Sequence, residues 1–191
     1  PKTWAKLYKT DDVVPVPTAK YYIEGITHVI EVDPMQLRIS VQNIPANLII
    51  LRNFVTSGYQ MMQAVGGAYP LGIFVSEGKI IQNRQPHNQP TGTLILYRNG
   101  KVECKPLLDI TKENDVWFAV SGCSILPQVR MNEEGFTGIF ADIGRICQRP
   151  VIGYRKKDNK IVIAVRDGSN IGRGQLTLKN LGCDFGITLD A

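Results

Sequence analysis

Four polar residues at the ends of apolar segments have side chains suited to chemistry on a phosphate or a sugar. Asn53 and Asp190 each follow an apolar run. Arg149 precedes such a run, and Asp167 closes one. Functional groups commonly lie where strands end, and an arginine there can hold a phosphate or a carboxylate through two parallel hydrogen bonds. Two neighbouring carboxylates push their pKa values apart, which equips one as an acid and the other as a base or nucleophile.

Each of these residues also has an ordinary structural interpretation. Asn53 could cap or turn the chain, Asp190 could be a solvated residue at a chain end, and Asp167-Gly168 is a common turn sequence. The segment "VRDGSNIGRG" is a glycine-rich loop that contains Gly168 and Arg173 and leads into a short helix. Such a loop can bind an anion through backbone N–H groups, although it matches neither G-x-G-x-x-G nor the P-loop. Gly168 and Arg173 are therefore candidate ligand-binding residues.

The composition narrows the classes of partner. The chain has 191 residues, 43% of them hydrophobic and 20% charged, with a net charge of +5, which fits a packed domain and permits a phosphate-bearing partner. The one dense basic cluster, Arg155-Lys156-Lys157, lies in a predicted turn, so we expect no specific nucleic-acid partner. No apolar stretch reaches the ~20 residues that span a bilayer, and the N-terminus lacks the apolar core of a signal peptide. We expect a protein of the cytoplasm of its producing cell without a membrane partner; a virion or secreted protein after processing is the alternative, and the oligomeric state is open.

Histidines and cysteines show no catalytic or metal-binding pattern. His28 lies within a predicted strand and His87 in a polar loop, so neither has a partner at the spacing of a Ser-His or Cys-His pair. The four cysteines lack C-x2-C spacing; their apolar contexts favour buried thiols, with two disulfides as the alternative. We expect no zinc site and no required cofactor, although two aspartates and an asparagine could hold a divalent cation.

Short β-branched apolar segments bounded by turn residues predict a fold rich in strands. "SEGK", "RNGK" and "RKKDNK" each separate two such segments and predict hairpins. Helices are few: one is predicted over 55–64 and one over 176–181, with Gly182 as its C′ residue. "MNEEGFTGIFADIGRIC" predicts a loop with a helical turn. The predicted strands cover residues 26–32, 37–41, 48–51, 71–75, 79–81, 93–97, 102–104, 116–120, 151–154, 160–166 and 185–189.

These elements predict a single α+β domain, in which successive hairpins build a mixed β-sheet with few short helices and a strand–helix–strand C-terminal end. Alternating apolar residues over 160–166 predict that both faces of this strand are covered. If the last two strands are parallel neighbours, Asp167 and Asp190 project at the same edge of the sheet. Residues 1–24 are predicted as an N-terminal extension and 25–191 as the domain.

Several segments resemble, in their order along the chain, the motifs of the phosphodiester glycosidase domain family over roughly residues 25 to 190. They include a strand ending in Asp, a buried strand that leads into an Asn-containing loop, a small-residue segment, an Arg-x-x-x-Gly hairpin and a final strand ending in Leu-Asp. The matching stretches are "HVIEVDP", "LIILRNF", "PLGIFVSEGKII", "GTLILYRNGKVE", "VSGCSIL", "RPVIGYRKKDNKIVIAVRDG" and "LGCDFGITLDA". The compact size and absent leader indicate a bacterial or phage member.

The resemblance implies a hydrolase that cuts the bond between the anomeric carbon of a sugar and a phosphate oxygen. Asn53, Arg149, Asp167 and Asp190 fall on the family's motif positions. Arg149 would neutralise the phosphate, and the two aspartates would activate water or stabilise an oxocarbenium-like state. Asn53 would orient a sugar hydroxyl or a phosphate oxygen.

The resemblance also implies a small-molecule ligand, either a sugar phosphodiester or a nucleotide-like compound. Ser121 and Gly122 of the small-residue segment join the candidate ligand-binding residues. The chain departs from the family pattern because "SGCSIL" lacks a proline, the helix before "LGC" is short, and no glycine run follows Leu189-Asp190. The alternative is a non-catalytic member that binds or sequesters a phosphorylated sugar or nucleotide, or a structural module of a phage or cell-surface assembly.

Overall fold

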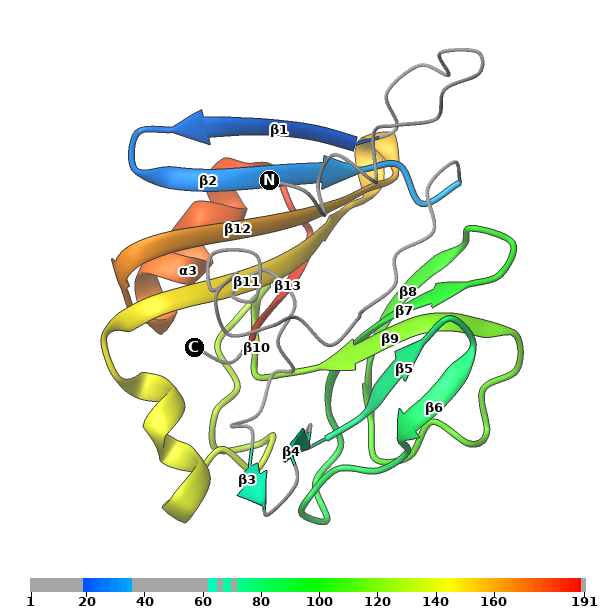
Figure 1. The fold of residues 1–191 in the computed structure, drawn as a ribbon. Helices are drawn as coiled ribbons and strands as arrows, with labels where there is room; N and C mark the ends of the chain where they lie inside the picture. The colour runs from blue at the N-terminus through cyan, green and yellow to red at the C-terminus, as the bar shows by residue number, and fades with distance from the viewer. Residues whose placement is uncertain (1–18, 36–61, 65–66, 70–71, 190–191) are drawn as a thin grey trace.

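The computed structural model describes residues 19–35, 62–64, 67–69 and 72–189, and arranges them around two antiparallel β-sheets (Figure 1). The first sheet has six strands in the spatial order β1-β2-β12-β11-β13-β10. Its strands are β1 (Ala19–Glu24), β2 (Thr27–Val32), β10 (Ser124–Leu126), β11 (Cys147–Arg155), β12 (Lys160–Ser169) and β13 (Phe185–Thr188).

The second sheet has five strands in the order β6-β5-β9-β7-β8, and a separate hairpin pairs β3 with β4. The strands are β3 (Met62–Ala64), β4 (Gly67–Tyr69), β5 (Phe74–Ser76), β6 (Lys79–Gln82), β7 (Thr91–Tyr97), β8 (Val102–Leu107) and β9 (Val116–Ser121). The described helices are two 3-10 helices and one α-helix, namely η2 (Gly138–Gly144), η3 (Lys156–Asp158) and α3 (Ile171–Asn180).

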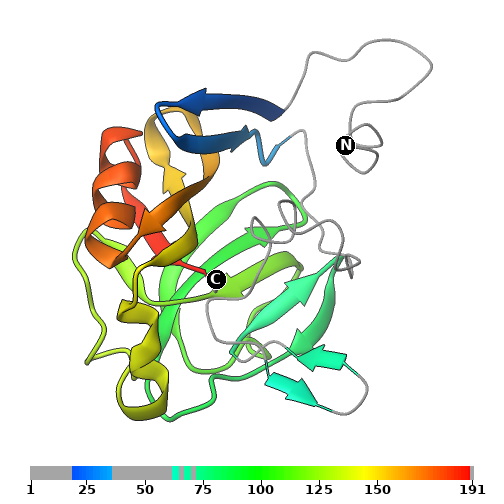
Figure 2. The same cartoon turned by 60° about the vertical axis from the view of Figure 1, so that its left-hand side comes forward.

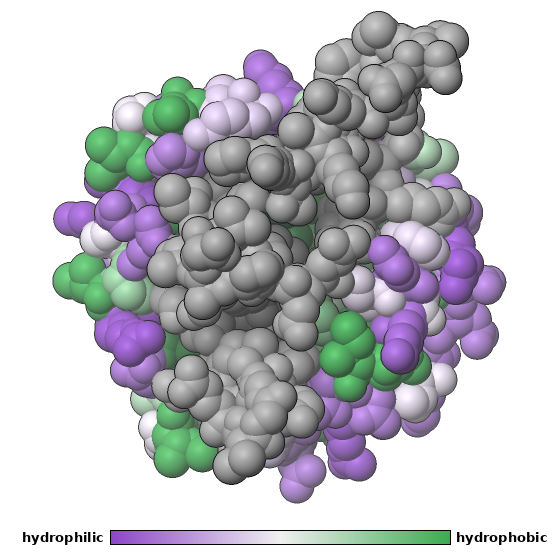
Figure 3. Space-filling view, in the orientation of Figure 1, coloured by the Kyte–Doolittle hydropathy of each residue, from purple (hydrophilic) through white to green (hydrophobic). Residues whose placement is uncertain are grey.

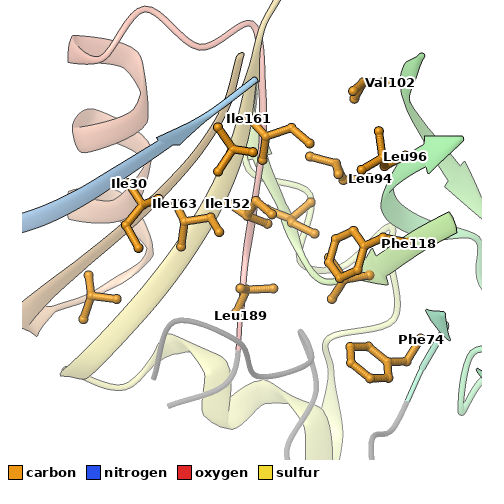
Figure 4. Packing of buried hydrophobic residues seen from close by; sticks show 14 residues of the cluster. Ile30, Phe74, Leu94, Leu96, Val102, Phe118, Ile152, Ile161, Ile163 and Leu189 are labelled. Carbon is orange, nitrogen blue, oxygen red and sulfur yellow. The ribbon is translucent and has the colours of Figure 1, made fainter. Parts of the chain in front are cut away.

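Large apolar side chains from both sheets fill the space between them (Figure 4). They point toward one another from facing strands and are buried from solvent. Because removing apolar surface from water drives folding, this shared core holds the two sheets together as one unit. The labelled members are Ile30, Phe74, Leu94, Leu96, Val102, Phe118, Ile152, Ile161, Ile163 and Leu189.

A second core lies on the other face of the six-stranded sheet, where α3 covers the strands (Figure 2). Alternate residues of β12 serve the two cores: Ile161 and Ile163 point between the sheets, whereas Val162 and Ala164 belong to the core under α3. The prediction that both faces of this strand are covered is confirmed. Gly174 lets α3 approach closely, since a Cβ at this position would lie 2.9 Å from Val151 Cγ1.

Most predicted strands are confirmed with bounds that differ by a few residues. The sequences "SEGK", "RNGK" and "RKKDNK" form the turns of the hairpins β5–β6, β7–β8 and β11–β12. The glycine-containing segment before β11 contains η2, as its helical turn predicts, and Gly182 follows α3 with a φ of +78°. The predicted strands 37–41 and 48–51 lie outside the described residues.

Three expectations differ from the structure. Residues 19–24, for which no strand was predicted, form β1 and pair with β2. Residues 62–64, at the end of the helix predicted over 55–64, form β3, while the rest of that range is outside the described residues. The described pairings are all antiparallel rather than mixed, so the domain is mainly β, with α3 as the one α-helix among the described residues.

The last two strands are not neighbours, which corrects the predicted parallel pair. β11, which a tight turn joins to β12, pairs along one edge of β12, and β2 pairs along the other, so β13 pairs with β11 instead. The connection through α3 therefore passes over β11 before the chain enters β13. Since both β12 and β13 run antiparallel to β11, they are parallel to each other and finish at the same end of the sheet.

The four cysteines are free thiols; Cys123 is buried as expected, whereas Cys104, Cys147 and Cys183 are partly exposed. Burial raises the pKa of the Cys123 thiol to about 12 and that of the Cys183 thiol to about 12. Both groups are therefore protonated at neutral pH, and a protonated thiol is a poor nucleophile.

The described surface is neither mainly hydrophilic nor mainly apolar on the face that Figure 3 shows. On the face shown in Figure 3, hydrophilic and apolar side chains are interspersed around the region drawn in grey. Exposed apolar side chains such as Ile23, Ile80 and Ile139 come from three different elements. Among the described residues, the helices lack the length and apolar character needed to traverse a bilayer.

We predict that Gly153→Ala destabilises the fold, because β11 and β13 pack too closely there to admit a methyl group. A Cβ on Gly153 would lie 2.8 Å from the Phe185 carbonyl oxygen and 2.9 Å from Cys183 Sγ. Overpacking of this kind typically costs about 1–3 kcal/mol. Urea unfolding measures the change. The control is Gly172→Ala in the exposed first turn of α3, where alanine favours the helix; equal stability of the two variants would contradict the prediction.

Candidate active site

The β11–β12 hairpin brings two arginines together at the end of the six-stranded sheet. Arg149 on β11 lies directly opposite Arg166 on β12. Directly opposite residues of antiparallel strands point to the same face with Cβ atoms about 5 Å apart. Val151 lies on the same face of β11 and belongs to the core under α3, so the two arginines continue that face beyond its apolar part.

Arg149 is a buried arginine without an acidic partner. Its residue is 2% exposed. Its Nη1 donates to the Leu189 carbonyl at 3.5 Å and its Nη2 to the Arg145 carbonyl at 3.2 Å. Among the described residues, no carboxylate lies within 4.0 Å of its guanidinium, and its Nε has no hydrogen-bond partner. A buried charge that is not paired is costly to the fold, which marks Arg149 as a group that can receive an external anion.

Arg166 is a site residue that we did not predict. Its Nε is also buried and unpartnered among the described residues, and its guanidinium makes no ion pair with any of them. The sequence did contain a signal for it. Arg155 pairs with Lys160 at the top of the hairpin, so counting six residues along each strand leads to the Arg149–Arg166 pair.

Asp167 and Gly168 form a bulge next to this pair. Cys147 is opposite Ser169 and Arg149 is opposite Arg166, so β12 has two residues where β11 has one. Gly168 adopts a left-handed φ of +58° at this bulge, a conformation that glycine adopts without strain. The residue Asp167 is exposed. The bulge therefore presents a carboxylate to solvent beside the arginine pair.

Arg173 lies at the same end of the sheet, in the first turn of α3. Its Nη1 donates to the Gly168 carbonyl at 2.8 Å, and its backbone N–H donates to Asn170 Oδ1, which caps the helix, at 2.9 Å. Arg173 is held against the bulge with its side chain exposed. Of the predicted residues, the structure thus brings Arg149, Asp167, Gly168 and Arg173 to one end of the sheet.

Asn53 and Asp190 lie outside the described residues. The description of the last strand ends at Leu189, directly before Asp190 in the sequence. Leu189 N donates to the Pro150 carbonyl at 2.9 Å, and its own carbonyl accepts from Arg149. The end of β13 therefore reaches the arginine pair. The ends of β12 and β13 are separated by two strand spacings, about 10 Å, because β11 lies between them.

Ser121 and Gly122 form the connection from the five-stranded sheet into β10. Ser121 is 0% exposed, and its hydroxyl donates to Gln85 Oε1 at 3.1 Å. Gly122 N donates to the Gly92 carbonyl at 2.9 Å. These contacts hold the crossing between the sheets. Within the described part of the chain, no hydrogen bond links Ser121 or Gly122 to the arginine pair.

Glu134 is a second unpredicted residue near this end of the sheet. It is 1% exposed; its Oε2 accepts from the Ser124 N–H at 2.8 Å, while its Oε1 has no partner among the described residues. Burial raises the pKa of the neighbouring Cys123 thiol, the Glu134 charge raises it further, and the Arg149 charge lowers it. Glu134 and Arg149 therefore both lie within electrostatic reach of one thiol. The sequence around Glu134 is acidic and loop-like, so it gave no signal that this side chain is buried.

The described residues assemble no group of three His, Cys, Asp or Glu side chains that could hold a metal ion. A cation site that uses Asn53 and Asp190 together with Asp167 would rest on two residues outside the described ranges. The chemistry that the described site supports is anion binding by arginine, with a solvent-exposed carboxylate at its side.

Comparison with known proteins identifies the fold. No protein-family model matches the chain, and no sequence among curated proteins matches it. Among solved structures, the chain is similar to the zebrafish N-acetylglucosamine-1-phosphodiester alpha-N-acetylglucosaminidase catalytic domain, described as auto-inhibited by its pro-peptide. The TM-score is 0.60 at 18% identity, over 90% of this chain and 68% of that one. A hypothetical protein from Synechocystis gives a TM-score of 0.44 at 11% identity, over 90% of this chain and 55% of that one. The first likeness shows a distant relationship in fold to a phosphodiester glycosidase domain.

Proposed function

We propose that this chain is a hydrolase that cleaves a sugar-1-phosphodiester between the anomeric carbon and the phosphate oxygen. The observation that supports this most directly is Arg149, a buried arginine at the end of the sheet without a carboxylate partner among the described residues. The fold shared with a phosphodiester-cleaving domain supports the same reaction class. The match of the predicted site residues to that family's motifs supplies the assignment of roles.

In the proposed reaction, Arg149 binds the non-bridging oxygens of the phosphodiester. The bond between the anomeric carbon and the phosphate oxygen breaks, and its electron pair leaves with the phosphate. Fixed positive charge at the leaving group stabilises the transition state, because negative charge grows there as the bond breaks. A phosphate monoester is a good leaving group, so this step needs little protonation.

Water supplies the oxygen that replaces the phosphate on the sugar. Its oxygen bonds to the anomeric carbon, and one of its protons passes to a carboxylate and then to solvent. We assign this role to Asp190, which comes soon after β13 in the sequence, and to Asp167, which lies in the bulge near the end of β12. Asn53 orients a sugar hydroxyl or a phosphate oxygen, and Gly168 and Arg173 line the ligand beside the bulge. The products are the free sugar and a phosphate monoester.

The test follows the oxygen atom. The full chain is incubated in ¹⁸O-labelled water with the methyl phosphodiesters of several sugar-1-phosphates, in the presence and absence of EDTA, and both products are analysed by mass spectrometry. We expect free sugar that carries one ¹⁸O and methyl phosphate that carries none. Label in the phosphate would contradict the proposal, because it would place the attack at phosphorus. Loss of activity in EDTA would add a divalent cation to the site.

Binding without turnover is the second candidate function. The buried Nε groups of Arg149 and Arg166 have no partner among the residues that the structure describes, which favours anion binding whether or not a bond is then broken. Calorimetry on the same methyl phosphodiesters separates the two functions. Tight binding with the diester recovered intact would identify the protein as a binding member of this fold.

A further inference from the structure

The two opposed arginines carry more positive charge than a phosphodiester needs. Arg149 and Arg166 are cross-strand partners on one face of the sheet. Like charges directly opposite each other destabilise an antiparallel pair, and here each guanidinium has a buried Nε that finds no acceptor among the described residues. Neither arginine forms an ion pair with Asp167 or with another described carboxylate. Within the described part of the chain, two positive charges therefore lie together without a carboxylate partner.

We propose that Arg149 and Arg166 together form a binding site for a phosphate dianion, and that the phosphate monoester released by the reaction binds there more tightly than the diester substrate. The identification of this dianion as the reaction product rests on the proposed function. The binding site itself rests on the register of the two arginines and on their buried Nε atoms, which lack a partner among the described residues.

The charges of the ligands set the preference. A phosphodiester carries one negative charge, whereas a phosphate monoester, with a second pKa near 6, carries about −1.5 to −2 at pH 7. Each guanidinium offers several N–H donors in a fixed fork that matches phosphate oxygens. A diester leaves one of the two arginine charges uncompensated, while a monoester satisfies both. The consequence for an enzyme is competitive inhibition by its own phosphate product.

None of the described carboxylates, Glu134 included, forms an ion pair with either arginine. Arg145, whose carbonyl accepts from Arg149, has its own guanidinium near Asp142 at 3.3 Å. Arg173 donates to the Gly168 carbonyl, which adds a third positive charge beside the bulge. Arg166 is partly exposed, so the ligand approaches from its side and reaches Arg149 behind it.

The experiment compares two ligands of matched shape by calorimetry at pH 8. Methyl phosphate is a dianion there, and dimethyl phosphate is a monoanion. We expect wild-type protein to bind methyl phosphate at least about tenfold more tightly. Arg166→Gln should weaken methyl phosphate binding about tenfold to hundredfold and change dimethyl phosphate binding less than about threefold. The matched control is Arg84→Gln, an exposed arginine beside the five-stranded sheet, which should leave both affinities unchanged.

Three outcomes would overturn the proposal: equal affinity of wild-type protein for the two ligands, an unchanged preference in Arg166→Gln, or an equal loss in Arg84→Gln. If the melting curve shows that Arg166→Gln does not fold, the proposal is still tested by the relative affinities of wild-type protein and of Arg166→Lys for the two ligands. The lysine keeps the charge but lacks the fork, and should retain part of the preference. Hydrolysis is not measured, so failure here leaves the proposed function standing, and failure of the ¹⁸O experiment leaves the dianion site standing.

Discussion

Arg149→Met is expected to lower kcat/KM for a sugar-1-phosphodiester about 100- to 1000-fold while leaving the protein folded. The loss follows from the role proposed for Arg149 at the leaving phosphate, since removing one preorganised charge donor from an acyl-transfer site has an effect of that size. Most of the decrease should appear in kcat, because the charge that Arg149 stabilises is largest in the transition state.

Stability distinguishes this role from a structural one. Arg149 is buried without a carboxylate partner among the described residues, so replacing it with an apolar side chain of similar length removes an unpaired buried charge. We expect the free energy of unfolding to change by less than about 1 kcal/mol, because the loss of two hydrogen bonds to carbonyls is offset by the removed desolvation cost.

Initial rates and urea unfolding of the same preparation provide both measurements, with Arg84→Met as the control that should change neither. A variant of Arg149 that retains activity within about threefold of wild type would remove this residue from the site. A variant that is inactive and also strongly destabilised would instead make Arg149 a structural arginine.

Local sequence signals predicted those parts of the fold that form between neighbouring residues. Asn99-Gly100 predicted the β7–β8 turn, and Gly100 has the positive φ of +86° that such a turn requires. Gly182 was predicted to end the last helix and does so. In each case, the physical cause lies within four or five residues of the chain.

The order of the strands depends on contacts between distant residues, and the sequence did not reveal it. β12 pairs with both β11 and β2, so β13 cannot pair with β12 and pairs with β11 instead. β1 was missed because it is an edge strand whose apolar residues, Tyr21 and Ile23, stay exposed. The sequence of β1, AKYYIE, also lacks the regular alternation of apolar and polar residues that marks a half-buried strand.

In the candidate site, too, local sequence signals predicted some residues, whereas contacts between distant residues determine the others. Arg149 was predicted from its position before the predicted strand 151–154, although it lies within β11, and Arg166 could have been predicted by extending the register of this hairpin. The burial of Glu134 could not be predicted, because it depends on the N–H of Ser124, ten residues away across an irregular loop. Asn53 and Asp190 stay predictions from the sequence.

Arg155→Met should behave in the opposite way to Arg149→Met, because Arg155 is a buried arginine whose partners are acidic. Its Nη1 lies 3.0 Å from Glu31 Oε1, its Nε lies 2.8 Å from Asp158 Oδ1, and Nη1 also donates to the Leu181 carbonyl at 2.9 Å. Removing one partner of a buried ion pair leaves the other charge uncompensated, at a cost of about 3–5 kcal/mol. Because solvent screens the charge of Asp158, whose side chain is 40% exposed, we expect the free energy of unfolding to fall by about 3 kcal/mol.

The destabilisation by Arg155→Met should depend on pH, because the two carboxyls that pair with Arg155 titrate. The hydrogen bond from Arg155 is the largest influence on both carboxyls, and holds the pKa of Glu31 and that of Asp158 below their usual values in the folded protein. A carboxyl whose folded-state pKa is depressed adds stability above its unfolded-state pKa and loses it as the pH falls through the folded-state value. The difference between wild type and Arg155→Met should therefore be complete at pH 7 and shrink below about pH 4. Urea unfolding across this range measures it, with Lys156→Met, the exposed neighbour, as the control. A difference that is independent of pH would assign the effect to the packing of the arginine side chain instead of its charge.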